Sequence, residues 1–383
     1  MKHIIYITNT RLPTEKAHGL ATMRIAEAFA SLGARVEIFA PRRRHPLKDN
    51  SFTYYKSREN FKIKKIPCLD FLWLKRGKNF FFWLQYLTFS LATLVYFIFS
   101  RSQDFKKAIF FSHDHLPLYF LSWFSPNIFY DIHDFPTDNF IYRRLLKKAK
   151  GFSVQTCWKI QELNKRFGVM PGKIVYWPNG TDIDRFTKEI SPESARTYLN
   201  LPSDKKIVVY TGHLFDWKGV DTLVKAVPLL DKEILVYLVG GTPEDVNEYK
   251  EKIKDKENII LPGFRPHEEI LYWLKAADIL ILPNTGRQDV SRFYTSPMKL
   301  FEYMAAGRPI VASRIHSIME VVDDNSAKLV EPDNPEALAR GIKDVLNDEH
   351  QGNKLAQTAQ NISRQYTWEK RAQLISNLMD KVF

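Results

Sequence analysis

Chemistry-bearing residues are concentrated between Tyr294 and Ser313, where the sequence reads YTSPMKLFEYMAAGRPIVAS. Pro297 predicts a helix start there, because its fixed backbone angle suits the first helical turn. The first amides of a helix lack partners and lie at the positive end of its dipole, so they suit a diphosphate. Glu302 lies too far inside this helix to cap it, and its carboxylate could accept hydrogen bonds from sugar or ribose hydroxyls. Gly307 then ends the helix.

The elements that must position these residues alternate between strand and helix along the chain, which is typical of parallel α/β sheets. Short apolar runs rich in β-branched or aromatic residues predict strands that are buried on both faces. The pattern restarts after Asn179-Gly180 and is broken near residues 180–203, which predicts two α/β units without internal repeats. The predicted strands are 3–8, 35–39, 107–111, 128–132, 206–211, 234–239, 258–261, 279–282, 309–312 and 327–330.

The segment Asn79–Ser100 has no charged residue and is long enough to cross a bilayer. A crossing would place strands of one predicted sheet on opposite sides of the membrane. Gln85, Thr88 and Tyr96 also contribute to a mild polar stripe at helical spacing. We therefore expect a helix that packs on the protein or lies at a membrane interface, in preference to a true span.

The net charge of +13 is unevenly distributed. The first 190 residues carry 31 Lys and Arg against 15 Asp and Glu, whereas the remainder carries 25 against 28. Such an excess suits an anionic partner, such as nucleic acid, an acidic lipid surface or a phosphorylated acceptor, or it serves solubility. No recognition helix or single-strand-binding motif supports nucleic acid, so we expect none as a partner.

Cysteine usage and the N-terminus indicate the compartment. Cys68 and Cys157 provide neither a disulfide framework nor a metal-ligand cluster, which favours a reducing cytosol. A strand-like run follows Met1-Lys2 directly, so no signal peptide is expected.

The segment Tyr294–Ser313 resembles the donor site of retaining GT-B glycosyltransferases of family four, the glycosyltransferase group 1 type. In that family a Glu-x7-Glu motif contacts the donor, with its first Glu near the sugar and its second near the ribose. Glu302 matches the second position, and Tyr294 stands where the first Glu is expected. Tyr294, Asp289 or Arg292 could substitute for it.

Other segments extend the resemblance. Tyr210–Asp221 is similar to the family's strand, glycine turn and Lys-Gly step, with His213 in place of an Arg and Lys218 matching a Lys, both facing the donor diphosphate. A cation there would stabilise the charge on the departing nucleotide, and His213 is only partly protonated at neutral pH. Lys218 could instead be a solvated lysine at a helix start. Leu261–Arg265 matches the base-binding segment, and Asn179–Phe186 resembles the interdomain hinge.

The N-terminal half matches more loosely. Lys16–Gly19 stands where the family has a Gly-rich loop against the diphosphate and acceptor, and Gly19 would let the backbone approach a phosphate. His133 ends a strand beside Asp134 and corresponds to a family His that contacts the donor sugar, although such a residue is also often only a satisfied loop histidine. The pair His113 and His115 has no third ligand in sight, so no metal is expected.

The resemblance implies an α/β fold of GT-B type, with two Rossmann-like domains facing each other across a cleft. We expect an acceptor- and membrane-facing domain over 1–185, a nucleotide-sugar domain over 186–365, and a helix over 366–383 that crosses back to the first domain. The expected catalytic residues are His133, Lys218 and Glu302, and the acceptor-binding residues are His18, His113 and Asp114. The expected donor-binding residues are Gly19, Gly212, His213, Lys218, Gly263, Phe264, Arg265, Tyr294, Thr295, Ser296, Pro297, Met298, Leu300 and Glu302.

The sequence therefore predicts a retaining glycosyltransferase that uses a UDP- or GDP-type nucleotide-sugar and a lipid-linked or polysaccharide acceptor, without a cofactor or essential metal. Four basic clusters suggest a peripheral position on the inner face of the cell membrane. They are Arg42–Arg44, Lys62–Lys65, Lys75–Lys78 and Arg143–Lys150. Two alternatives stay open: a nucleotide-sugar-binding protein without transferase activity, and a nucleotide-sugar epimerase on the same fold.

Overall fold

The computed structural model describes residues 1–44, 47, 49–74, 77–100 and 103–383. It divides the chain into two compact units, which we call unit 1 (Met1–Pro178 with Trp368–Phe383) and unit 2 (Asn179–Thr367). Each unit contains one sheet in which all described strand pairs are parallel. The predicted α/β class with two Rossmann-like halves is confirmed.

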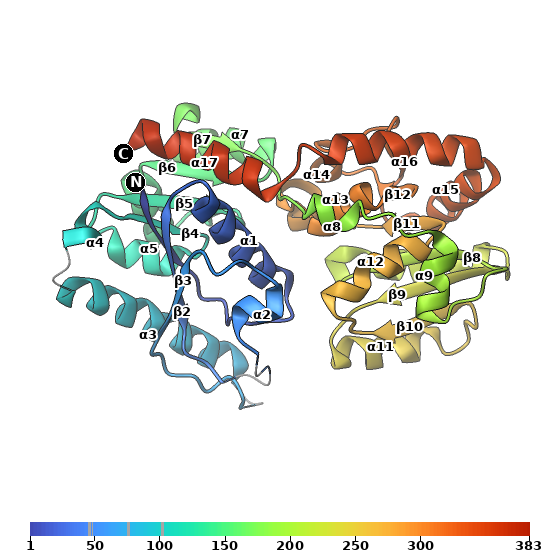
Figure 1. Cartoon of the computed structure of the whole chain (residues 1–383), viewed down its shortest axis with the longest axis horizontal. Helices are drawn as coiled ribbons and strands as arrows, with labels where there is room; N and C mark the ends of the chain where they lie inside the picture. Colours follow the sequence, from blue (N-terminus) through green and yellow to red (C-terminus); the bar gives the residue numbers. More distant parts are fainter. Residues whose placement is uncertain (45–46, 48, 75–76, 101–102) are drawn as a thin grey trace. The chain divides into compact units, whose positions relative to one another are not determined.

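Unit 1 has a seven-stranded sheet in the order β3-β2-β1-β4-β5-β6-β7 (Figure 1). Its strands are β1 His3–Ile7, β2 Arg35–Pro41, β3 Lys62–Ile66, β4 Ile109–Ser112, β5 Ile128–Ile132, β6 Gly151–Val154 and β7 Ile174–Tyr176. Its helices are α1 Ala17–Ser31, α2 Ser51–Tyr55, α3 Lys78–Phe99, α4 Gln103–Lys107, α5 His115–Leu121, α6 Phe140–Lys148, α7 Cys157–Phe167, the short η1 Pro171–Lys173 and α17 Trp368–Val382. Strands β4, β5 and β6 are buried along their whole length and form the centre of the core.

Unit 2 has a six-stranded sheet in the order β10-β9-β8-β11-β12-β13. Its strands are β8 Lys206–Thr211, β9 Ile234–Val239, β10 Ile259–Gly263, β11 Ile279–Leu282, β12 Ile310–Ser313 and β13 Lys328–Val330. Its helices are α8 Ile183–Phe186, α9 Pro192–Leu199, η2 Asp216–Lys218, α10 Val220–Ala226, η3 Val227–Leu229, α11 Pro243–Ile253, α12 His267–Ala276, η4 Val290–Tyr294, α13 Met298–Ala306, α14 His316–Met319, α15 Pro335–Asn347 and α16 Glu349–Ser363.

The strand order reverses direction at one point in each sheet. In unit 1 this point lies between β1 and β4, and in unit 2 it lies between β8 and β11. Ligands of open α/β sheets bind beyond the carboxyl ends of the strands at such a point. The fold therefore marks the segments after β1 and β4, and those after β8 and β11, as the places to look for a site.

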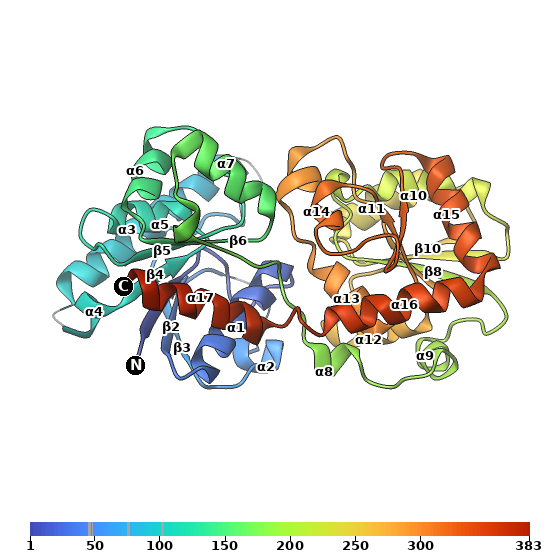
Figure 2. The same ribbon diagram turned by 90° about the horizontal axis from the view of Figure 1, so that it is seen from above.

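The C-terminal helix α17 belongs to unit 1, where it packs along α1 (Figures 1 and 2). The chain thus passes between the units twice, after Pro178 and after Thr367. The first point lies seven residues before the predicted boundary at 185, and the second lies two residues after the predicted boundary at 365. The reason is that the segment from Asn179 to Phe186 is bonded within unit 2: Asn179 donates to Ser296, and Thr181 N donates to Tyr366 O.

Helix α3 covers the segment that could have been read as a membrane span. Only 28% of its most apolar window is buried, and it is the one helix in the described part of the chain with the length and composition of a span. Its inward face, which includes Gln85 and Phe89, packs on unit 1. The outward face remains apolar, and Phe80, Trp83 and Phe99 are more than half exposed.

Candidate active site

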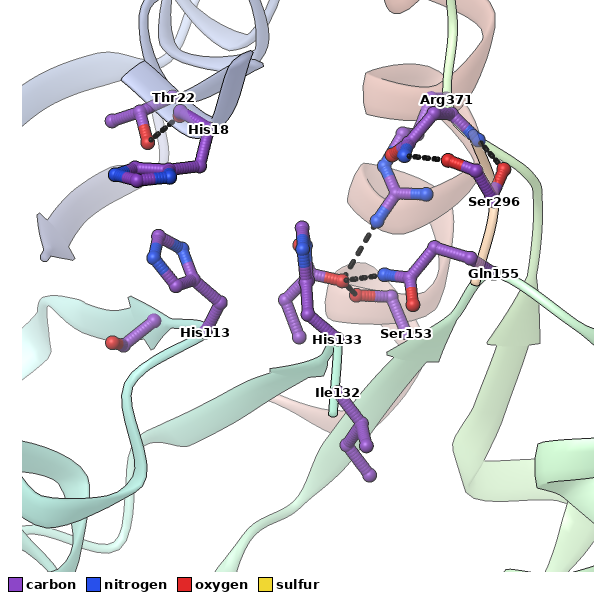
Figure 3. A network of polar contacts seen from close by, with 12 residues as sticks. His18, Thr22, His113, Ile132, His133, Ser153, Gln155, Ser296 and Arg371 are labelled. Atoms are coloured by element: carbon purple, nitrogen blue, oxygen red, sulfur yellow. Dashed lines mark hydrogen bonds and ion pairs between the residues drawn. The ribbon is translucent and has the colours of Figure 1, made fainter. Parts of the chain in front are cut away.

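In unit 1, polar side chains gather where β1, β4 and β5 end. His113 follows β4, and its ring nitrogens lie 3.0 Å from Tyr6 Oη and 3.4 Å from Thr8 Oγ1. His133 follows β5, with its ring centroid 5.1 Å from that of His113. Figure 3 shows the imidazole of His18, from the first turn of α1, near that of His113. Three of the predicted site histidines therefore lie together at the reversal point of this sheet.

A buried carboxylate holds His133 in place. Asp131 Oδ2 lies 2.9 Å from His133 Nε2, and Asp131 is 2% exposed. Burial opposes its charge, but Arg371 and His133 more than offset this and hold the pKa of Asp131 well below its usual range. The other oxygen, Oδ1, accepts hydrogen bonds from Ser153 Oγ (2.6 Å), Gln155 Nε2 (3.0 Å) and Arg371 Nη2 (2.7 Å) (Figure 3).

The environment of His133 favours its neutral form. Burial lowers its pKa, Asp131 opposes this, and His113 lowers it further. A neutral imidazole that donates to Asp131 through Nε2 keeps Nδ1 as an acceptor. Lys159 fixes the backbone beneath it, because Nζ donates to Ile132 O at 2.8 Å and to His133 O at 2.5 Å. His133 can therefore accept a hydrogen bond from a sugar hydroxyl without supplying a positive charge.

Two predicted residues of unit 1 have structural partners. Asp114 Oδ2 accepts a hydrogen bond from Asn9 N at 2.6 Å, which ties the loop after β4 to the loop after β1. Gly19 is buried in α1, and a Cβ at this position would overlap the Tyr55 hydroxyl and the Thr14 methyl group. Close packing against Tyr55 and Thr14 therefore requires a glycine at position 19, whether or not a phosphate binds there.

In unit 2, Gly212 and Lys218 lie at the carboxyl end of β8, at the reversal point. Gly219 follows Lys218 with φ 70°, and a Cβ there would collide with Pro283 O. The glycine therefore lets the η2 turn dock on the end of β11. Lys218 Nζ lies 3.6 Å from the centroid of the Trp217 ring, and burial lowers its pKa to about 7. His213 stacks on Phe215, with ring centroids 5.0 Å apart.

Helix α13 supplies the carboxylate and a second cation to the same edge. Glu302 is 9% exposed and lies 3.3 Å from His267 Nε2. Lys299 lies one turn earlier on the same helix face, and its Nζ is 3.6 Å from the centroid of the Tyr210 ring. The cap residue Pro297 makes no side-chain hydrogen bond to the helix start. The edge thus combines an uncapped helix start, a carboxylate and two ammonium groups.

The remaining predicted donor residues divide by environment. Leu300 is fully buried in the core, so its side chain does not line a site. Ser296 accepts from Asn179 N through its hydroxyl and from Asn179 Nδ2 through its carbonyl, so it anchors the hinge segment, and Met298 is the first residue of α13. Thr295 N donates to Val290 O at 2.9 Å.

The other predicted donor residues of unit 2 lie in two segments, the end of β10 and the turn η4. Gly263 ends β10 with φ 76° and accepts a hydrogen bond from Gly240 N. Phe264 beyond it is 53% exposed, and Arg265 pairs with Glu269 at 3.5 Å. The candidates for the missing first Glu lie in and around the π-helical turn η4: Asp289 precedes it, Arg292 lies over the Phe293 ring, and Tyr294 ends it. Such turns are frequent at functional sites.

The histidines after β4 do not form part of a larger ligand cluster. His115 Nδ1 lies 3.1 Å from Tyr142 Oη, and burial lowers the pKa of His115. Within the described ranges, no group of three or more His, Cys, Asp and Glu residues is arranged to hold a metal ion.

Sequence reasoning passed over Lys299, His267 and Arg371. Lys299 lies between Met298 and Leu300, which were both predicted to bind the donor. A lone lysine in an otherwise apolar helix, three residues before Glu302 and therefore on the same helix face, could have indicated a second cation at the donor site. No local pattern connects His267 with Glu302 or Arg371 with Asp131, because these pairs are 35 and 240 positions apart.

Comparison with known proteins gives two family matches that together cover most of the chain. Residues 20–185 match the family described as Glycosyltransferase Family 4, and residues 205–348 match Glycosyl transferases group 1. A D-inositol 3-phosphate glycosyltransferase from Corynebacterium glutamicum (strain R) is 24% identical over 250 residues, 62% of this chain and 58% of that protein. The matched part of this chain thus spans less than two thirds of that relative.

Solved structures of similar fold cover the whole chain. A sucrose-phosphate synthase from Thermosynechococcus elongatus has a TM-score of 0.79 at 19% identity, covering 100% of this chain and 99% of its own. HepE from Anabaena, in complex with UDP, has a TM-score of 0.74 at 17% identity, and each chain is covered completely. These likenesses and the two parallel sheets show the GT-B fold. The two family matches show that the chain belongs to the group 1, family 4 glycosyltransferases.

Proposed function

We propose that this glycosyltransferase moves a sugar from a nucleotide-sugar of UDP or GDP type to a lipid-linked or saccharide acceptor, with retention of configuration. The observation that carries the proposal is the edge of unit 2 where Lys218, Lys299 and Glu302 meet an uncapped helix start. Cations and helix-start amides suit a diphosphate, and a largely buried carboxylate suits hydroxyl groups. The complex of HepE with UDP supports the same donor class.

In the proposed reaction the bond between the sugar C1 and the donor phosphate breaks, and its electron pair moves to the diphosphate. The acceptor oxygen bonds to C1 from the same face, and its proton goes to the departing phosphate. Lys218 stabilises the charge on that phosphate, which is a typical use of fixed cations near a leaving group. His133 accepts a hydrogen bond from the sugar and orients it, so no protein side chain is needed as a base.

The decisive test uses labelled donor and an acceptor panel of lipid-linked and free saccharides. We expect transfer, with the same anomeric configuration in product and donor when the product is analysed by proton NMR coupling constants. Donor binding without transfer or hydrolysis would instead favour a binding protein. Conversion of the sugar on an intact donor would favour an epimerase.

We further propose that unit 1 places the acceptor at the inner face of the cell membrane. Helix α3 presents exposed apolar side chains along one face, with Trp83 55%, Val95 50% and Phe99 77% exposed. Lys64 lies beside this helix, with Nζ 3.9 Å from the centroid of the Tyr96 ring. An apolar face flanked by basic residues suits an anionic bilayer. Lys75 and Arg76 of the predicted basic clusters lie outside the described residues.

Some basic residues of the predicted clusters already contact an acidic or aromatic side chain within unit 1. The membrane proposal therefore depends more on the apolar face of α3 than on attraction between basic residues and anionic lipid. Arg43 lies 3.7 Å from Asp70, Arg143 pairs with Asp138, and Arg144 lies over the Trp123 ring. We expect flotation with anionic liposomes at low salt, and loss of flotation in Trp83→Glu. The control is Leu229→Glu, which changes an exposed leucine of unit 2. Absence of flotation with anionic vesicles, or no effect of Trp83→Glu, would contradict the membrane proposal.

A further inference from the structure

The ammonium group of Lys299 is buried without a hydrogen-bond acceptor in the described part of the chain. Lys299 is 9% exposed, and an isolated buried ammonium is costly unless it is paired. Two other buried lysines show the usual solution. Lys159 donates to Ile132 O, His133 O and Gln155 Oε1, and Lys275 donates to Ala306 O at 2.9 Å. Lys299 therefore lacks the hydrogen-bond acceptors that Lys159 and Lys275 have.

The Lys299 ammonium group lies at the glycine turn after β8. A Cβ on Gly212 would lie only 3.0 Å from Lys299 Nζ, so the glycine leaves the room that the ammonium occupies. Gly212 has φ 120°, a backbone conformation that favours glycine. The ammonium also lies over the ring of Tyr210, which attracts a cation but accepts no conventional hydrogen bond from it.

The charged side chains near Lys299 do not provide its amino group with an anionic partner of its own. Burial lowers the pKa of Lys299 well below its usual value, the charge of Lys218 lowers it further, and Glu302 opposes both effects. Glu302 already lies within hydrogen-bonding distance of His267. The side chains of Lys218 and Lys299 thus share one edge of the sheet with the Glu302 carboxylate, beside the positive end of α13.

We propose that Lys299 and Lys218 together bind the diphosphate of the donor, with Lys299 as a ligand of the phosphate that departs. This inference rests on the proposed function and adds a catalytic residue to it. A dianionic diphosphate supplies the acceptors that Lys299 lacks and balances the two positive charges. As the C1–O bond breaks and its electron pair moves to the diphosphate, both lysines stabilise the added charge.

The test compares Lys299→Met with Lys275→Met, a matched control that also removes a buried lysine from a helix of unit 2. Calorimetric titrations with UDP, GDP and inorganic pyrophosphate measure affinity, and uridine and guanosine serve as ligands without phosphate. We expect Lys299→Met to weaken diphosphate binding by about 10- to 100-fold, the usual range for a hydrogen bond to a charged group. Its affinity for the matching nucleoside should not change.

The free protein provides a second readout. Lys299→Met replaces a buried amino group that lacks a hydrogen-bond acceptor with an apolar side chain, so it should raise the urea midpoint of unit 2. Lys275→Met breaks a buried hydrogen bond, so it should lower the midpoint and leave diphosphate binding intact. If wild type binds UDP or GDP and Lys299→Met binds it equally well, the role of Lys299 is overturned while the proposed function stands. If wild type binds neither nucleotide nor pyrophosphate, both are overturned.

Discussion

The buried pair of Asp131 and Arg371 makes a strong prediction about unit 1. Arg371 is 1% exposed, and its guanidinium donates to Asp131 Oδ1, to Trp177 O at 2.6 Å and to Pro178 O at 3.2 Å. It therefore joins α17, β5 and the last residues before the chain leaves unit 1. We expect Arg371→Met to leave the Asp131 carboxylate buried without its cation.

The expected magnitude follows from that geometry. Removing one partner of a buried ion pair costs about 3–5 kcal/mol, because the remaining charge stays desolvated. With a urea dependence of about 2 kcal/mol per molar, the unfolding midpoint of unit 1 should fall by about 1.5–2.5 M. The matched control is Lys2→Met, since Lys2 also links the sheet region to α17 but pairs with an exposed Asp380 at 2.7 Å. That change should cost less than about 1 kcal/mol.

The assay must separate the two units. Six of the eight tryptophans belong to unit 1, and Trp217 and Trp273 are the two in unit 2. In a background with Trp217→Phe and Trp273→Phe, tryptophan fluorescence during urea unfolding therefore reports on unit 1. A midpoint for Arg371→Met within 0.5 M (about 1 kcal/mol) of that for Lys2→Met would refute the reasoning.

The same variant should change the pH dependence of stability. In wild type the pKa of Asp131 is depressed, so its contribution is present above the unfolded value of about 4 and is lost as the pH falls. Without Arg371, we expect burial to raise the pKa of Asp131 instead. The charged carboxylate then lowers the free energy of unfolding as the pH rises. The deficit of Arg371→Met should thus be larger at pH 8 than at pH 5, and an equal deficit would contradict this account.

Three further predictions concern the reaction. His133→Ala should keep its affinity for UDP or GDP but lose transfer by about 100-fold, since it removes a group that orients the sugar; unchanged turnover would remove His133 from the site. Transfer should survive EDTA, because no step uses a divalent metal, and loss that is restored by Mg²⁺ would contradict this. Burial lowers the pKa of Lys218 to about 7, so diphosphate binding should take up protons above that pH. Calorimetry in buffers of different ionisation enthalpy measures this uptake, which should be reduced in Lys218→Met.

Strands formed by longer apolar runs could be predicted well from the sequence. In unit 2 every predicted strand is present within two residues, because runs such as Ile279–Leu282 are apolar without interruption. The prediction missed β3, β6 and β7 in unit 1. The edge strand β3 has the sequence KIKKI, and its lysines were interpreted only as a basic cluster. Pairing with β2 forms this strand, and such pairing is not a local property of the sequence.

The candidate site shows the same limit. Motifs with fixed spacing, such as Lys218-Gly219 and the helix that contains Glu302, could be found from the sequence and lie at one edge of unit 2. Contacts made by folding could not, and they include the approach of Lys299 to Gly212 and of Arg371 to Asp131. Gly19 was predicted to lie near a phosphate, but the structure gives a different reason for a glycine there: a Cβ at this position would overlap the side chain of Tyr55.

The central claim is that unit 2 holds a nucleotide-sugar through Lys218 and Glu302. The most direct measurement is calorimetric titration of the protein with UDP, GDP, ADP and their common sugar conjugates. We predict tight binding of one nucleotide series, abolished in Lys218→Ala and Glu302→Ala. Absence of binding to every nucleotide would contradict the claim, and unit 2 would then be a family scaffold without a donor site.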